Sequence, residues 1–342
     1  MLCLEVLSIS QFLCIHYINI SLTFNNICNV GASAGLGAAF PQISDDIDNE
    51  GTLKFSVLGR GFGFFCGLLC CLFIVSKWNS SWFVWCMVGL NMFSSCFTFA
   101  LAFIADLKYY EVWLVVFPFF QGIGFASCDA VGNQFLLEKW RAPDGTNADG
   151  QSWVHLVHAG FTGGGLIGPL LVGALGYRLG FMLLGLCCLV PVSLLTASSI
   201  ANGSMISRST PSTAAPPIHD ISGNTLNPFI VYALEIWFFF LMGQEIAFSS
   251  WISSYVIDSG ISSSDAKAAY AGSAFYAAML FGRIMMGLSP TIREMGNAVV
   301  LKGFINFQFI SSALLLIFAL TWRSFEDIGY WVLIVLILVR HY

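Results

Sequence analysis

Charged residues are scarce in this chain. Of its 342 residues, 14 are Lys or Arg and 19 are Asp or Glu, which together make up 10% of the sequence. A soluble domain carries about 25% charged residues, so this composition excludes an ordinary soluble globular protein. The formal net charge is −5 and there is no run of basic residues, so we expect no nucleic-acid partner.

Basic residues are missing from the N-terminal region, and metal-binding spacings are missing throughout. The first 53 residues contain no Lys or Arg, whereas a secretory signal peptide begins with a positively charged segment. We therefore expect the first hydrophobic span to act as the targeting signal. The 11 cysteines are scattered and include no C-x-x-C pair, which predicts small packing residues rather than metal ligands. We expect no metal ion and no cofactor.

Long apolar runs are what the chain has in abundance. Hydrophobic residues make up 57% of it, and the mean hydropathy is +0.79. Continuous runs of about 20 apolar residues cross a bilayer as α-helices, whereas the strands of a barrel are shorter and alternate. The sequence therefore predicts an all-α, multi-pass membrane protein of the plasma membrane or an internal membrane. About ten spans are expected, at residues 12–40, 55–76, 82–105, 112–137, 153–175, 181–200, 228–257, 268–288, 298–322 and 328–339.

A polar segment at residues 201–227 divides these spans into two groups. It contains many Ser, Thr and Pro residues and too few apolar ones to cross a membrane, which is typical of a flexible linker. We predict an N-terminal six-helix bundle over residues 1–200, a cytoplasmic linker, and a C-terminal bundle of about four helices over residues 228–342. The Lys and Arg residues of the loops are slightly more numerous on the linker side, as the positive-inside bias requires.

One carboxylate lies near the middle of the fourth span. Asp129 is the one ionisable residue between residues 112 and 137, and Asn133 follows four residues later, so both lie on one helix face. An acid at the bilayer centre costs about 2.5–3.5 kcal/mol, and it usually faces a bundle interior or a wet cavity. We predict a substrate, ion or proton site at Asp129. The alternative is a structural, hydrogen-bonded aspartate.

The seventh span contains a second carboxylate with aromatic residues after it. Glu245 stands beside Gln244, and Trp251 and Tyr255 are four residues apart, so the two rings form a ledge on one helix face. Carboxylates and amides beside a flat apolar surface can hold a sugar, because they bind its hydroxyls while its C–H faces stack on the rings. The alternative for the two aromatic residues is an interfacial belt.

Histidines, glycines and one proline distinguish the fifth span. His155 and His158 share a helix face, and each is either a polar residue of the cavity or a hydrogen-bonded residue of the bundle. No third ligand is spaced for zinc. Pro169 removes one backbone hydrogen bond and is expected to kink the helix. Four glycines are expected to let a neighbouring helix approach closely, namely Gly163, Gly164, Gly165 and Gly168.

Two arginines fall inside apolar spans. Arg283 lies near the cytoplasmic end of the eighth span, where it can reach the surface or cap a neighbouring helix. We interpret it as a conformational latch rather than a substrate ligand. Arg60, in the second span, either pairs with Asp129 or lines the cavity.

Four sequence blocks occur in order in the fourth, fifth, seventh and eighth spans. They read GIGFASCDAVGNQF, HAGFTGGGLIGPLL, GQEIAFSSWISSYV and AFYAAMLFGRIMMG. Together they resemble the major facilitator superfamily, in the branch that holds fucose permease and the sodium-dependent glucose transporter-like proteins. The resemblance implies the two-bundle fold of that superfamily, whose halves each contain six helices. Six plus four helices then indicate a truncated gene model, a splice form or a shortened protein. The loop SKWNSSW lacks the superfamily's basic, Asp-containing gating motif.

The same resemblance implies a set of binding residues. Asp129 takes the family's carboxylate position, Asn133 its asparagine, and His158 the position of a polar cavity residue. The other matched positions are Glu245, Trp251, Tyr255 and Arg283.

By this resemblance the chain is expected to be a secondary transporter that moves a sugar or a similar small neutral solute by alternating access. A proton or sodium ion at Asp129 would supply the coupling, since a neutralised carboxylate can pass through the occluded state whereas an ionised one cannot. One alternative is a carrier of another small organic solute on the same fold. Another is a truncated, non-transporting sensor or scaffold. An enzyme is not expected, because no catalytic set, phosphate loop or metal cluster is visible.

Overall fold

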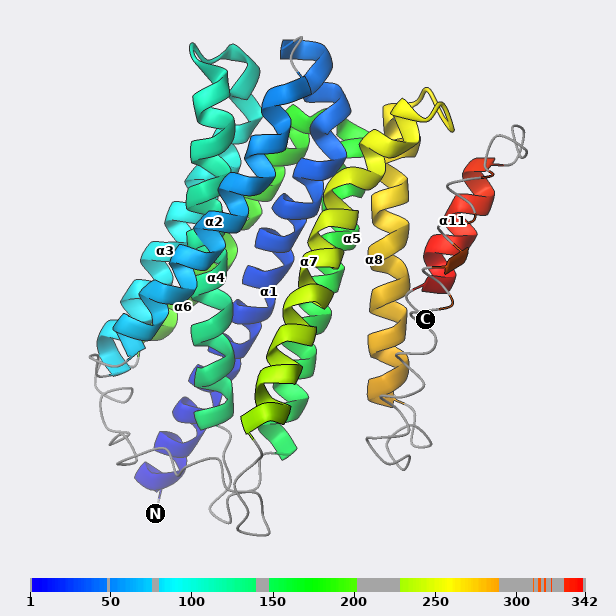
Figure 1. Cartoon of the computed structure of the whole chain (residues 1–342). Coiled ribbons are helices and arrows are strands. Elements are labelled where there is room, and N and C mark those ends of the chain that lie inside the picture. Colours follow the sequence, from blue (N-terminus) through cyan, green and yellow to red (C-terminus); the bar gives the residue numbers. More distant parts are fainter. Residues whose placement is uncertain are drawn as a thin grey trace.

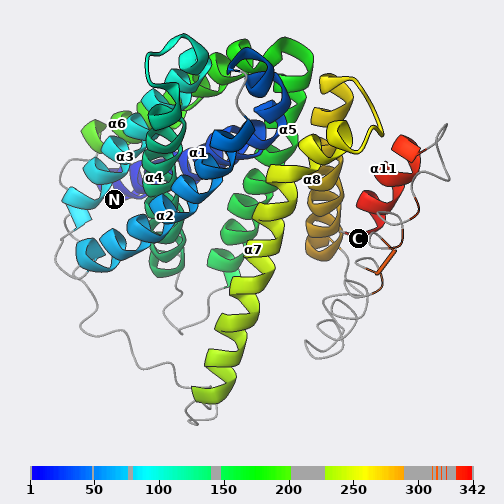
Figure 2. The ribbon, with the colours of Figure 1, turned by 45° about the horizontal axis from the view of Figure 1, so that its top comes forward.

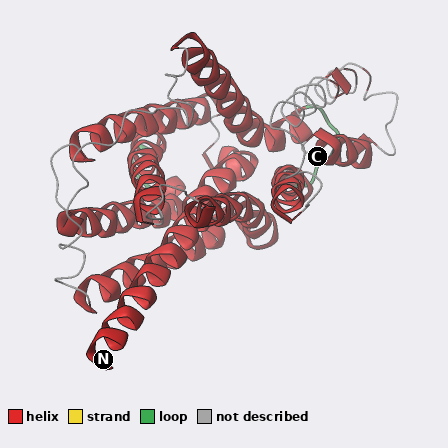
Figure 3. Cartoon of the chain, turned by 90° about the horizontal axis from the view of Figure 1, so that it is seen from below, coloured by secondary structure: helices red, strands yellow, loops and turns green. Residues whose placement is uncertain are grey.

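The computed structural model describes residues 2–47, 50–75, 80–139, 148–201, 228–288 and 329–340, with single positions between residues 310 and 321. Helices make up nearly all of this part of the chain, and no strand occurs in it (Figures 1 and 3). The helices are α1 (Leu2–Ile47), α2 (Glu50–Val75), α3 (Ser80–Ala100), η1 (Leu101–Asp106), α4 (Tyr110–Lys139), α5 (Ala148–Cys187), α6 (Leu189–Ala201), α7 (Pro228–Asp258), α8 (Asp265–Leu288) and α11 (Gly329–Arg340).

Most of the predicted spans coincide with these helices to within a few residues. The first does not: α1 contains 46 residues, longer than the predicted span 12–40, because helix continues through polar residues at both ends. Pro169 lies inside α5, where only Gly176 has non-helical backbone angles. The predicted linker beyond Ala201 and most of the predicted span 298–322 lie outside the described residues.

A single glycine turns α5 back on itself. Gly176 has φ 77° and ψ 162°, a conformation that residues with a Cβ rarely adopt. A Cβ built on Gly31 of α1 would lie 3.2 Å from the Gly164 carbonyl oxygen and 3.1 Å from the Leu184 side chain. In a straight helix these two positions would be about 30 Å apart. The two arms of α5 therefore form a hairpin against α1, and they correspond to the predicted fifth span and the start of the sixth.

Two glycine stripes set the closest helix contacts. On α5, Gly164 faces α1 so closely that a Cβ there would lie 2.2 Å from the Ile27 carbonyl oxygen. On α2, a Cβ at Gly63 would lie 1.9 Å from the carbonyl oxygen of Phe119 on α4. In both pairs the contacts advance together along the two chains, so the helices run parallel. The stripes consist of Gly160, Gly164 and Gly168 on α5, and Gly59, Gly63 and Gly67 on α2.

The opposite face of α2 is apolar and exposed. Phe55, Leu58, Phe62 and Phe65 follow helical spacing and are each more than half exposed, which suits a surface that faces lipid. Among the residues with described side chains, three helical segments are long and apolar enough to cross a membrane: Leu53–Cys71, Val88–Asp106 and Leu156–Leu194, the last of which includes the turn at Gly176. The chain is a helical, multi-pass membrane protein.

The second half of the chain packs on α1 and α5. Helix α7 meets α1 where the Phe40 and Trp251 rings lie 5.4 Å apart. Helix α8 packs along α5, and a Cβ on Gly165 would lie 2.2 Å from the Tyr276 ring. Helix α11 lies beside α8 at the edge of the molecule (Figures 1 and 2). These contacts bring α7 and α8 against the first half of the chain.

Candidate functional site

The Asp129 carboxylate is the point where α1, α4 and α5 meet. Asn26 of α1 and Asn133 of α4 each donate a side-chain amide hydrogen bond to Asp129 Oδ1, both at 3.4 Å. Asn26 Nδ2 also reaches the Val157 backbone oxygen of α5 at 3.5 Å. Asp129 is half-buried. The two bonds are at the long limit for N–H···O hydrogen bonds, so they hold the carboxylate loosely, and both go to the same oxygen.

A row of buried asparagines on α1 supports this position. Asn25, Asn26 and Asn29 are each at most 1% exposed. Asn29 donates to the Asn25 side chain at 2.6 Å and accepts a short hydrogen bond from Ser94 of α3. The polar character of the first span is visible in the sequence. Its role in fixing Asp129 is not, because the contact from Asn26 joins residues 103 positions apart.

Arg283 joins α8 to α5 at the same level. Its Nη1 donates a hydrogen bond to the His158 backbone oxygen at 2.5 Å, and its guanidinium lies 5.4 Å from the centre of the Phe161 ring. It is also within electrostatic range of Asp129 and Glu245. The structure places this arginine half-buried and pointing into the bundle, rather than at the membrane surface.

Glu245 of α7 is the second acid within electrostatic range of Arg283. The residue is 8% exposed, and its Oε1 has no hydrogen-bond partner in the described structure. The Tyr276 ring on α8 is within electrostatic range of this carboxylate and hydrogen-bonds to Ser249, one turn along α7. The side chains of Gln244 and His155 lie outside the described residues.

Arg60 of α2 completes the set. It is 9% exposed, and its guanidinium lies 5.9 Å from the centre of the Phe125 ring of α4. It forms no ion pair with Asp129, so of the two predicted roles the pairing is absent. We use the name polar cluster for Asn26, Arg60, Asp129, Asn133, Glu245, Tyr276 and Arg283.

The charges of the polar cluster interact at longer range than a direct ion pair. Within the described structure, ion pairs occur only at Arg178, far along α5, which binds Asp46 and Asp106. The polar cluster holds two acids and two arginines among buried neighbours, and several of its polar atoms have no partner in the described chain, among them Arg60 Nη1, Asn133 Oδ1 and Glu245 Oε1. Such an arrangement is suited to binding a polar solute or an ion.

Trp251 and Tyr255 lie away from this cluster. Trp251 packs on Phe40 of α1 and Tyr255 packs in a second apolar group around α8 and α11. Six and ten residues separate them from Glu245 on α7, which corresponds to about 9 and 15 Å along a helix. The two rings therefore pack in different apolar groups, away from Glu245. The rings that border the cluster are Phe125 and Phe161, whose centres are 6.1 Å apart.

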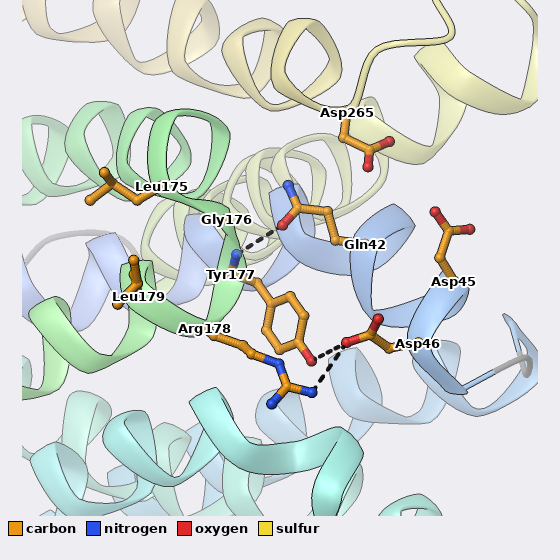
Figure 4. Close-up of a pocket in the computed structure, with 9 residues that line it drawn as sticks. All are labelled: Gln42, Asp45, Asp46, Leu175, Gly176, Tyr177, Arg178, Leu179 and Asp265. Atoms are coloured by element: carbon orange, nitrogen blue, oxygen red, sulfur yellow. Dashed lines mark hydrogen bonds and ion pairs between the residues drawn. The ribbon is translucent and has the colours of Figure 1, made fainter.

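A hollow lies beside the C-terminal end of α1, at the end of the molecule that is at the top in Figure 1. It has a volume of about 490 Å³ and opens to the surface. Figure 4 shows the Tyr177 hydroxyl donating to Asp46 at 2.7 Å and the Tyr177 amide donating to Gln42 at 2.8 Å. Arg178 forms a two-pronged ion pair with Asp106, at 2.7 and 3.1 Å. These contacts tie the Gly176 turn to α1 and η1.

Asp265 borders the same hollow from the first turn of α8. Burial raises the pKa of its carboxyl, and the neighbouring Asp45 carboxylate raises it further. The hollow therefore joins the two halves of the chain through groups that respond to pH. It carries exposed acids and one paired arginine, so we assign it a structural role at this end.

Comparison with known proteins gives the fold and leaves the sequence family open. No family model matches the chain, and no curated protein matches its sequence. Solved structures do match, and two of them are crystal structures of a bacterial homolog of the human lysosomal transporter Spinster. The inward-facing, occupied structure has a TM-score of 0.62, and the inward-facing, unoccupied one 0.60. Each is 14% identical in sequence to this chain, and the match covers 95% of this chain and 72% of the bacterial one. The chain thus has a fold similar to that of this bacterial transporter.

Proposed function

We propose that this protein is a secondary transporter that moves a small polar organic solute across a membrane by alternating access, coupled to a proton or a sodium ion at Asp129. The fold likeness supports the transporter class. The observation that carries the coupling is the loosely held Asp129 carboxylate, which has two hydrogen bonds of 3.4 Å from amides and no ion pair.

The physical reason is the cost of a bare charge. An ionised carboxylate is expensive to move into a closed, dry state, whereas a protonated or cation-bound one is close to neutral. Asn26 and Asn133 donate hydrogen bonds and so favour the ionised form, but they leave Asp129 half-buried and open to a cation. Arg283 could compete with the cation for this charge, which would link the state of Asp129 to the contact between α8 and α5.

A sugar is our first candidate for the solute. The resemblance to the fucose permease and sodium-dependent glucose transporter-like branch supports it, as do the amide, carboxylate and hydroxyl groups of the polar cluster. Phe125 and Phe161 offer ring faces beside these groups. We place Asn133, Glu245 and Tyr276 among the proposed hydroxyl ligands, with His158 at the border through its contact with Arg283.

The test is uptake of a panel of radiolabelled hexoses into proteoliposomes that hold the full chain, with an imposed proton or sodium gradient. We expect accumulation with one gradient. Asp129→Asn should abolish accumulation while exchange down a gradient persists, because the amide mimics the neutral carboxyl. Asp106→Asn is the matched control, since Asp106 is an exposed aspartate bound to Arg178, and it should transport normally.

Accumulation against a gradient by the Asp129→Asn variant would refute the coupling role. If the folded wild-type chain moved no hexose, the neutral-sugar assignment would fail. If it moved no solute of any charge, the result would favour a non-transporting sensor or scaffold.

A further inference from the structure

Arg60 is the buried cation of the polar cluster that no described carboxylate offsets. It is 9% exposed. Among the described residues Tyr276 is the titratable group within electrostatic range of Arg60, and the Arg60 guanidinium faces the Phe125 ring. Nη1 has no hydrogen-bond partner in the described structure. A guanidinium has five N–H donors, and leaving one buried and unmet is costly.

The two acids of the polar cluster interact with Arg283 rather than with Arg60. Asp129 and Glu245 are both within electrostatic range of Arg283 on α8. Neither is coupled in this way to Arg60, whose guanidinium is held on the α4 side by Phe125. Arg178 shows the contrasting arrangement: it is 46% exposed and doubly bonded to Asp106. Arg60 thus keeps its positive charge inside the bundle without an ion pair to a described carboxylate.

We propose that Arg60 binds an anionic group of the transported solute, a carboxylate or a phosphate, so that the preferred solute is a sugar that carries such a group rather than a neutral hexose. This inference rests on the proposed transport function and narrows its substrate class. The planar guanidinium matches the paired oxygens of either group. The Tyr276 hydroxyl, near Arg60, and the Phe125 ring beneath it would border the bound group.

The charge count of the cluster agrees with this assignment. Two acids and two arginines balance when the site is empty. An entering carboxylate adds one negative charge, which a proton or sodium ion at Asp129 would compensate; a phosphate adds up to about two, of which one would be compensated in this way. Binding of the anion and binding of the coupling cation should therefore strengthen each other, as linkage requires.

The test measures binding to the full chain in lipid nanodiscs by thermal stabilisation. The probes share one ring and differ in charge: glucose, glucuronate and glucose 6-phosphate, with acetate and inorganic phosphate as bare anionic groups. We expect at least one anion to bind about tenfold or more tightly than glucose, as charge-assisted bonds require. The glucuronate and phosphate arms show which group is preferred.

Arg60→Met should remove that preference while leaving the ligand-free protein as stable as the wild type or more so, because it deletes an unpaired buried charge. Arg60→Lys should retain part of the preference, since lysine keeps the positive charge but cannot donate the paired hydrogen bonds of a guanidinium. Arg178→Met, which removes a paired guanidinium at the end of the molecule, should leave binding unchanged.

Several results would overturn the proposal and separate it from the transport function. Tight binding of glucose alone, or anion binding that Arg60→Met leaves intact, would refute the role of Arg60 while transport still stands. Loss of ligand-free stability in Arg60→Met with no anion effect would make Arg60 a packing residue. No binding and no uptake of any probe would defeat the transport function and this inference together.

Discussion

The glycine stripe between α1 and α5 allows a sharp test of how closely these helices approach. A Cβ on Gly164 would lie 2.2 Å from the carbonyl oxygen of Ile27, and 2.8 Å from both its carbonyl carbon and its Cα. All three atoms belong to the backbone, so no flexible side chain can move aside. An ordinary contact needs somewhat more than 3 Å, and Gly164→Ala therefore requires the helices to separate locally by about 1 Å.

The neighbouring position supplies the control. Gly163 is in the same turn of α5, but a Cβ there would meet nothing within 4 Å. Both substitutions gain about 0.8–1.0 kcal/mol of helix propensity, so their difference isolates the steric term. Overpacking of this kind costs about 1–3 kcal/mol. With about 2–4 °C per kcal/mol for proteins of 150–250 residues, we expect Gly164→Ala to melt several degrees below Gly163→Ala.

The assay is thermal unfolding of both variants and the wild type in the same detergent or nanodisc. A transport measurement adds a second readout, because Ile27 is next to Asn26, whose 3.4 Å bond to Asp129 would lengthen as α1 moves. Equal melting temperatures for the two variants would refute the close contact between α1 and α5. Lower stability with unchanged coupling would show that the position of Asn26 does not matter for transport.

Two further predictions concern the end of the molecule that carries the Gly176 turn. Gly176→Ala should lower the free energy of unfolding by about 1–3 kcal/mol, because φ 77° strains a residue with a Cβ. The control is Gly61→Ala, whose Cβ would meet nothing within 4 Å and which should not lower stability. Equal melting temperatures for the two variants would contradict the hairpin. For Asp265, the folded protein binds the proton more tightly than the unfolded chain, since its pKa is raised. Its contribution to stability is present in acid and lost as pH rises through the raised pKa. Asp265→Asn should remove this pH-dependent loss of stability, so the variant should be more stable than the wild type near neutral pH. The measurement is the melting temperature of both proteins across a pH series. A difference between them that stays the same at every pH would contradict the prediction.

Local sequence was sufficient for features that depend on residues near one another in the chain. The apolar runs predicted helices α2, α3, α4, α7 and α8 to within a few residues, because a membrane span must satisfy its own backbone hydrogen bonds. The spacing of Asp129 and Asn133 predicted their shared face, and they are hydrogen-bonded. Gly164 and Gly168 were expected to let another helix approach closely, and both do so against α1.

The sequence analysis missed partners that come from distant segments. It noted the polar α1 without connecting Asn26 to Asp129, and it overlooked Tyr276 and the second stripe at Gly63. It grouped Trp251 and Tyr255 on one helix face, but it did not predict the separate apolar groups in which they pack. A periodic pattern fixes which residues share a face, but it does not fix which way that face is rotated within a bundle.

The sequence by itself determined that this protein is a helical membrane protein with carboxylates and arginines inside its spans. Those properties follow from the cost of placing charge and unpaired backbone in lipid. The tertiary structure alone decided which of these groups meet. Asp129 accepts amide hydrogen bonds from two helices, and Arg283 donates to the His158 carbonyl oxygen 125 residues away. Arg60 forms no ion pair with an acid in the described chain. Helix rotation and packing set these pairings, because glycine contacts on α2 and α5 fix how closely the helices lie and therefore which side chains point inward.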